Sequence, residues 1–94
     1  MKQTHKIQTG SIKSAIDISP NDTKIKDFIF DNINNFSFQN LVDIGIKYYN
    51  KNEYENAINI LTQAETSSEK ESDKKMARTW IGNCERKMNE KLLD

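Results

Sequence analysis

Cysteine, proline and glycine are all scarce in this chain of 94 residues, which has one Cys, one Pro and three Gly. A single Cys excludes an internal disulfide, and one Cys with one His is too few ligands for a structural zinc site. The shortage of Pro and Gly argues against a turn-rich β-sandwich and permits long helices. The 14 acidic and 14 basic residues cancel, so no overall charge would attract a polyanion.

Long apolar runs are missing as well. No segment approaches the roughly 18 apolar residues that a membrane span needs, and no apolar stretch typical of a signal peptide follows Met1. We therefore expect a small, soluble, cytoplasmic protein of all-α fold with no membrane partner.

The N-terminal segment 1–18 carries no acidic residue before Asp17. Gly10 and scattered Ser and Thr leave no clean hydrophobic period in it. We predict a flexible basic tail over 1–18, followed by one helical domain over 19–94. Two alternatives stay open, a mitochondrial presequence and a short strand or helix docked on the domain. The basic residues of the segment are Lys2, His5, Lys6 and Lys13.

Hydrophobic spacing and capping residues predict about four helices. These helices are expected over residues 20–35, 38–50, 53–66 and 70–91. Ser19 and Pro20 are typical of a helix start, and Ser37 is a preferred N-cap residue. Asn52 followed by Glu55 forms a capping-box pattern for the third helix. The polar link between the second and third helices is short, which predicts an antiparallel hairpin.

The dipeptide Ile44-Gly45 recurs as Ile81-Gly82, 37 residues further along the chain. A glycine in the middle of a helix costs about 1 kcal/mol relative to alanine. Close approach of a neighbouring helix would compensate for that cost. The repeated dipeptide therefore predicts a tight helix contact beside Gly45.

Together with its surroundings, Ile44-Gly45 resembles one tetratricopeptide repeat over residues 38–71. The family pattern has a large residue, Leu-Gly three positions later, then Tyr, a second Tyr, a small Ala, an aromatic residue or Leu, and another Ala. The matching residues are Leu41, Ile44, Gly45, Tyr48, Tyr54, Ala57, Leu61 and Ala64. A second repeat would have Tyr at Glu85, and Glu69 stands near the place of the Pro that ends a repeat. The alternative is a generic antiparallel hairpin with a seam of small residues.

The resemblance implies a protein–protein interaction module without catalysis, such as a small adaptor, a chaperone-like cofactor or an inhibitor. The residues suggest no competing chemistry, because Cys84 lies on an apolar stripe and His5 lies in the predicted tail. Gly-rich phosphate loops and metal-binding patterns are missing. We predict no enzyme activity, no cofactor and no metal. The alternative is a small helical nucleic-acid-binding regulator that uses the basic tail and helix 70–91, although Glu85 and Glu90 interleave with its basic residues.

Helix 38–50 carries a second apolar stripe, beyond the one that its hairpin needs. The stripe is Val42, Ile46 and Tyr49. In the resembled family this face lines a concave groove for ligands; alternatively, helix 20–35 covers it. The residues 37 positions after this stripe are Thr79, Asn83 and Arg86, which would form the polar edge of the groove. We predict that these six residues bind another protein, or a peptide segment with an acidic residue near Arg86.

The small number of repeats predicts that an apolar face at one end of the helix stack has no further repeat to cover it. Solenoid proteins usually need about three repeats, because each repeat buries its face on a neighbour. This chain resembles at most two partial repeats, so helix 20–35, self-association or a partner must close the end. We expect a homodimer.

Overall fold

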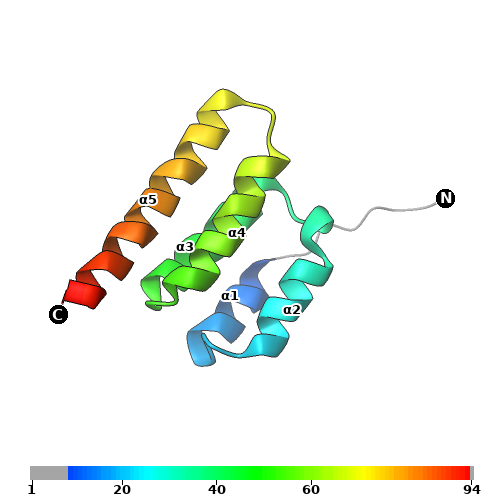
Figure 1. The fold of residues 1–94 in the computed structure, drawn as a ribbon. Helices are drawn as coiled ribbons and strands as arrows, with labels where there is room; N and C mark the ends of the chain where they lie inside the picture. Colours follow the sequence, from blue (N-terminus) through cyan, green and yellow to red (C-terminus); the bar gives the residue numbers. More distant parts are fainter. Residues whose placement is uncertain (1–8, 94) are drawn as a thin grey trace.

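The computed structural model describes residues 9–93, and this part of the chain contains helices and no strand. Five α-helices and one short 3-10 helix, η1, follow one another along the chain (Figure 1). Their bounds are α1 Thr9–Ile18, α2 Thr23–Asp31, η1 Ile33–Asn35, α3 Phe38–Asn50, α4 Tyr54–Ser67 and α5 Glu71–Leu93. The expected all-α class is confirmed, with one α-helix more than the four expected.

The additional helix is α1, which occupies most of the segment where we expected a flexible tail. Ile12 and Ile16 are buried and lie one helical turn apart, so they form an apolar face that packs against α3. The prediction of a tail is therefore wrong for residues 9–18, where the docked-helix alternative holds. Residues 1–8 of the predicted tail lie outside the described residues.

Helix α2 is shorter than the predicted helix 20–35. Asp22, not Ser19, is its N-cap, and the Asp22 carboxylate accepts a hydrogen bond from the Lys24 amide at 2.8 Å. Ser19 and Pro20 lie in the turn between α1 and α2 instead. Asn32 is the C-cap of the helix, and both its amide at 3.1 Å and its side chain at 2.9 Å donate to the Phe28 carbonyl.

Helices α3 and α4 form the antiparallel hairpin that the sequence predicts, joined by residues 51–53 (Figure 1). Ser37 caps α3 as predicted, its hydroxyl accepting from the Asn40 amide at 3.1 Å. The predicted capping box of α4 is absent, because Glu53 is the N-cap and no side chain caps the helix. Asn52 has a φ of 65°, a left-handed conformation that asparagine tolerates better than most residues. The chain then reverses so tightly that the Glu53 amide donates to the Tyr48 carbonyl at 2.9 Å.

Small residues are buried in both helices of this hairpin. They are Gly45 of α3 and Ala57 and Ala64 of α4. A Cβ atom on Gly45 would lie only 2.7 Å from Cγ of Leu61 on α4, so only glycine permits this approach. The predicted tight contact at Gly45 is confirmed. Its counterpart Gly82 has no atom within 4 Å of where a Cβ would lie.

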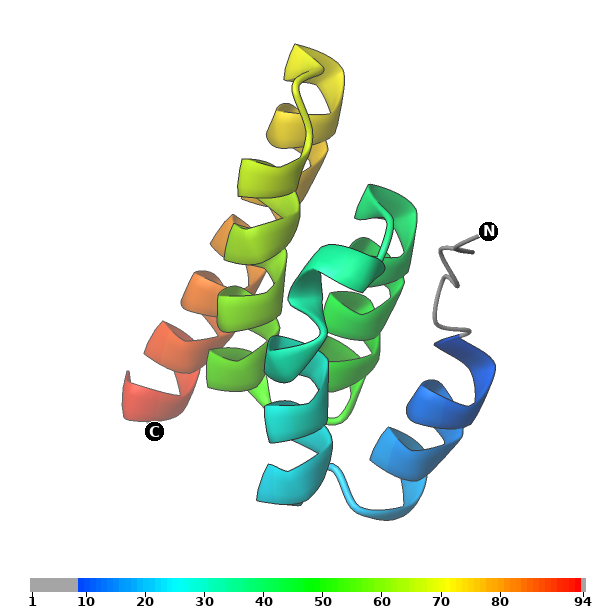
Figure 2. The same ribbon diagram turned by 90° about the vertical axis from the view of Figure 1, so that its right-hand side faces the viewer.

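Helix α5 packs along α4 on one side of the hairpin, while α1 and α2 lie on the other side (Figures 1 and 2). The short connection to α5 is ordered by Ser68, whose hydroxyl donates to the Asp73 carboxylate at 2.7 Å. Arg78 of α5 bridges to Glu65 of α4 at 2.6 Å. The shared core draws large side chains from every α-helix of the described chain. They include Ile16, Ile29, Leu41, Ile44, Tyr48, Ile60, Leu61 and Cys84.

Candidate partner-binding surface

Val42, the first residue of the predicted anchor stripe, is buried in the core. It is only 1% exposed and belongs to the same apolar cluster as Ile12 and Ile16 of α1. Val42 therefore cannot contact a partner in this fold, and its place in the predicted site is wrong. Helix α1 packs against α3 and supplies cover for this face. Ile29 of the predicted helix 20–35 is buried in the same apolar cluster, whereas Phe28 of that segment is 46% exposed.

Ile46 stays half-buried at the edge of the contact between α1 and α3. With Lys13 of α1 it lines a shallow cavity of about 210 Å³ whose other walls are Asp43, Lys47 and Asn50. An ion pair links the C-terminal end of α1 to the end of α3. The Asp17 carboxylate lies 2.8 Å from Lys47 Nζ and 3.4 Å from Lys51 Nζ.

Tyr49 lies at the centre of an aromatic row that links three helices. Its ring contacts Tyr54 of α4 edge-to-face, with centroids 5.6 Å apart, and Trp80 of α5 in the same manner at 5.4 Å. All three rings are half-buried. The row Trp80–Tyr49–Tyr54 therefore presents aromatic surface between α3 and α5. Sequence analysis included Tyr49 in the site but neither Tyr54 nor Trp80.

The predicted polar residues lie on α5: Thr79 precedes Trp80, Asn83 lies about one turn beyond it, and Arg86 lies nearly two turns beyond it. Thr79 and Arg86 are exposed, and Asn83 is half-exposed. Their described side-chain hydrogen bonds stay within α5: Thr79 donates to the Lys75 carbonyl at 2.9 Å, and Arg86 donates to Asn83 Oδ1 at 2.8 Å. The structure thus brings Tyr49 to Trp80 and leaves these three polar residues available on the same helix as Trp80.

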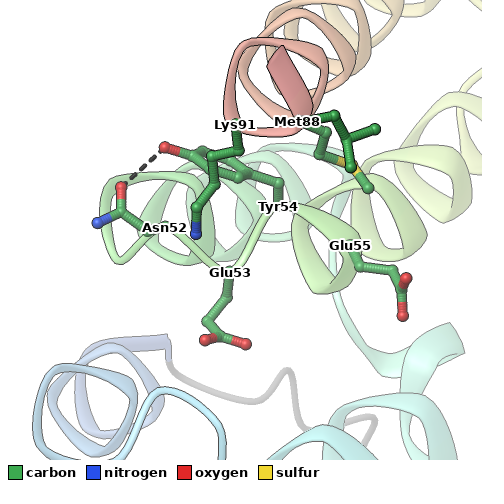
Figure 3. A pocket seen from close by; sticks show the side chains of 7 residues that line it. Asn52, Glu53, Tyr54, Glu55, Met88 and Lys91 are labelled. Atoms are coloured by element: carbon green, nitrogen blue, oxygen red, sulfur yellow. Dashed lines mark hydrogen bonds between the residues drawn. The ribbon is translucent and has the colours of Figure 1, made fainter. Parts of the chain in front are cut away.

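A second hollow opens where the start of α4 meets the end of α5 (Figure 3). This α4–α5 cavity measures about 360 Å³. Its lining residues are Asn52, Glu53, Tyr54, Glu55, Met88, Lys91 and Leu92. The Tyr54 hydroxyl donates to Asn52 Oδ1 at 2.8 Å, which fixes the ring as one wall of the cavity. The left-handed turn at Asn52 therefore positions this wall.

Two buried titratable groups are held in their neutral forms. Burial, with the negative charges of Glu53 and Asp22, raises the pKa of Tyr48 to about 12. Burial, with a smaller effect of Glu85, raises the pKa of Cys84 to about 11. The Cys84 thiol is therefore protonated at neutral pH, which makes it a poor nucleophile. No group of three metal-ligating side chains occurs within residues 9–93.

The cations of α5 are partly neutralised by neighbouring groups. Arg78 is paired with Glu65, Lys87 lies 3.8 Å from Glu90, and Lys74 Nζ donates to the Glu65 carbonyl at 2.9 Å. Such interleaving leaves no purely basic face along this helix, whereas a nucleic-acid footprint usually has one.

Comparisons with protein-family models, with curated proteins and with solved structures found no match to this chain. Among the helices described here, none combines the length and the apolar character that crossing a membrane requires.

The α4–α5 cavity was missed by sequence analysis. Its walls lie more than thirty positions apart in the chain, and Met88 looked like an ordinary member of the apolar stripe of α5. One signal was present, because Leu92 follows Met88 by four residues and continues its helical spacing. Leu92 is 82% exposed in the fold.

Proposed function

We propose that this protein is a small tetratricopeptide-like module that binds another protein or a peptide segment without catalysis. The hairpin α3–α4 supports the proposal, since Gly45 beneath Leu61 and the buried Ala57 and Ala64 occupy positions of the resembled repeat. The partner would lie along the surface formed by the half-exposed Ile46, the aromatic row and the polar residues of α5.

The contact between Tyr49 and Trp80 is the observation that carries this proposal. It joins α3 to α5 through two half-exposed rings, and aromatic residues contribute strongly to protein interfaces. Arg86 and Asn83 lie further along α5 and offer polar contacts beside the rings. An acidic residue in the partner would complement Arg86.

The test compares capture of partners from nuclease-treated extract of the source cells by the wild type and by Tyr49→Ala. Loss of Tyr49 should reduce the captured partner at least tenfold, because an aromatic interface residue can contribute about 2 kcal/mol or more. Phe28→Ala is the matched control, since Phe28 is an exposed aromatic residue on α2, away from this surface. The captured partner is then titrated against purified protein while the fluorescence of Trp80, the only tryptophan of the chain, is recorded.

The stability of the free variants must be measured beside binding. Tyr49→Ala removes two edge-to-face contacts, each worth about 0.5–1.5 kcal/mol, whereas Tyr48→Ala empties a core site and should cost about 3–5 kcal/mol. Equal partner capture by the wild type and Tyr49→Ala would contradict the proposed surface. Binding of oligonucleotides that weakens steeply with salt would instead support the nucleic-acid alternative.

A further inference from the structure

The end of the molecule around the α4–α5 cavity carries both a hollow and a protruding apolar side chain. Tyr54 and Met88 form half-buried walls of the cavity, and Leu92 stands at its edge with 82% of its surface exposed. In Figure 3 the Tyr54 side chain extends from the start of α4 toward Asn52, to which its hydroxyl is hydrogen-bonded. A large aliphatic side chain so exposed beside an apolar hollow is unfavourable in water.

The charges around the cavity are of both signs and come from different walls. Glu53 and Glu55 belong to the α4 side, and Lys91 belongs to the α5 side (Figure 3). None of these three groups takes part in a salt bridge within the described residues. Considering residues 9–93 alone, the patch therefore offers two acids and one base without ion-pair partners beside the same hollow.

We propose that this patch binds a second copy of the chain in a two-fold symmetric dimer. A symmetric interface uses the same patch on both copies, so each feature must be matched by another feature of that patch. Leu92 of each copy would fill the cavity of the other, between Tyr54 and Met88. Lys91 of each copy would pair with Glu55 of the other, because the two charges lie on opposite walls. This proposal does not rest on the function proposed above, although the two surfaces share Tyr54, the end of the aromatic row.

The size of the patch predicts a weak dimer. Seven residues line the cavity, whereas a stable interface usually involves about 20–30 residues on each side. We therefore expect a dissociation constant of about 10 μM to 1 mM. The protein should be monomeric in dilute solution and dimeric when concentrated.

Sedimentation equilibrium of the purified protein over this concentration range provides the test. The average mass of the wild type should rise toward that of a dimer, and Leu92→Asp should abolish the rise. Ile18→Asp is the matched control, because Ile18 is also 82% exposed but lies at the end of α1. Thermal unfolding followed by circular dichroism verifies that each variant is folded, as expected for substitutions at exposed positions.

A charge exchange distinguishes this interface from any other contact between copies. Glu55→Lys and Lys91→Glu should each weaken association at least threefold, since each leaves like charges facing one another across the two-fold axis. The double variant carries both changes in every copy and should regain the wild-type dissociation constant. A wild type that stays monomeric at about 1 mM would overturn the proposal. Dimerisation of Leu92→Asp, or failure of the double variant to recover, would overturn it as well.

Discussion

Gly45 and Gly82 allow one substitution to be compared in two packing environments. Each follows an isoleucine in the middle of a helix, and neither has a positive φ. Replacement of a helical glycine by alanine gains about 1 kcal/mol of stability when nothing obstructs the new methyl group. At Gly82 the space is open, so Gly82→Ala should raise the free energy of unfolding by about this amount.

At Gly45 the same methyl group meets Leu61. It would lie 2.7 Å from Cγ and 2.8 Å from Cδ2, whereas ordinary contact begins at 3.4 Å, so the buried Leu61 must retreat by roughly 0.7 Å. Such overpacking costs about 1–3 kcal/mol, and the helical gain of about 1 kcal/mol offsets only part of it. We expect Gly45→Ala to destabilise the protein by about 0–2 kcal/mol.

Urea denaturation followed by circular dichroism measures both free energies. A difference of 1 kcal/mol should also move the melting temperature by about 4–8 °C in a domain of this size. Leu61→Ala supplies the decisive background, because it removes the atoms that obstruct the new methyl group. In that background Gly45→Ala should become stabilising, as at Gly82. If Gly45→Ala stabilises the otherwise unchanged protein as much as Gly82→Ala does, then Leu61 does not lie over Gly45 and the hairpin seam is misplaced.

Two further predictions concern buried and ionised groups. Within the described residues the buried Tyr48 hydroxyl has no hydrogen-bond partner. Tyr48→Phe removes this hydroxyl and should therefore raise the free energy of unfolding by about 1 kcal/mol. A lower free energy of unfolding for Tyr48→Phe in urea denaturation would show that the hydroxyl does have a partner. The hydrogen bond from Lys47, helped by Lys51, lowers the pKa of Asp17 below its ordinary value of 3.8. The contribution of Asp17 to stability is therefore full above about pH 4 and is lost as the pH falls through the lowered pKa. The difference in melting temperature between the wild type and Asp17→Asn should shrink below pH 4, and a difference independent of pH would contradict this ion pair.

The hairpin α3–α4 was accessible from sequence because its determinants are local. Ser37 caps a helix whose apolar residues recur at helical spacing, and the polar turn that follows is too short for any other connection. Gly45 in the middle of α3 indicated a close neighbour even before that neighbour was known. Turn chemistry was harder to predict, since the left-handed conformation of Asn52 makes Glu53 the N-cap of α4.

The candidate site was less accessible, because exposure depends on what lies opposite each side chain. Val42 has the spacing of a surface stripe and is buried only because α1 packs against α3. Tyr54 and Met88 lie at apolar positions of their helices, yet they line an open cavity where the start of α4 meets the end of α5.

The sequence by itself determined that this protein is helical and where α3, α4 and α5 lie, because hydrophobic period and capping act over a few residues. Only the tertiary structure decided that α1 is a helix packed on the domain, since Ile12 and Ile16 contribute to stability only when α3 buries them. It also distinguished the two identical Ile-Gly dipeptides, because Leu61 packs over Gly45 whereas the space beside Gly82 is open. The local pattern of residues specifies which face of a helix is apolar. The free energy of burying that face depends on the segment that packs against it, and this segment can be far away in the sequence.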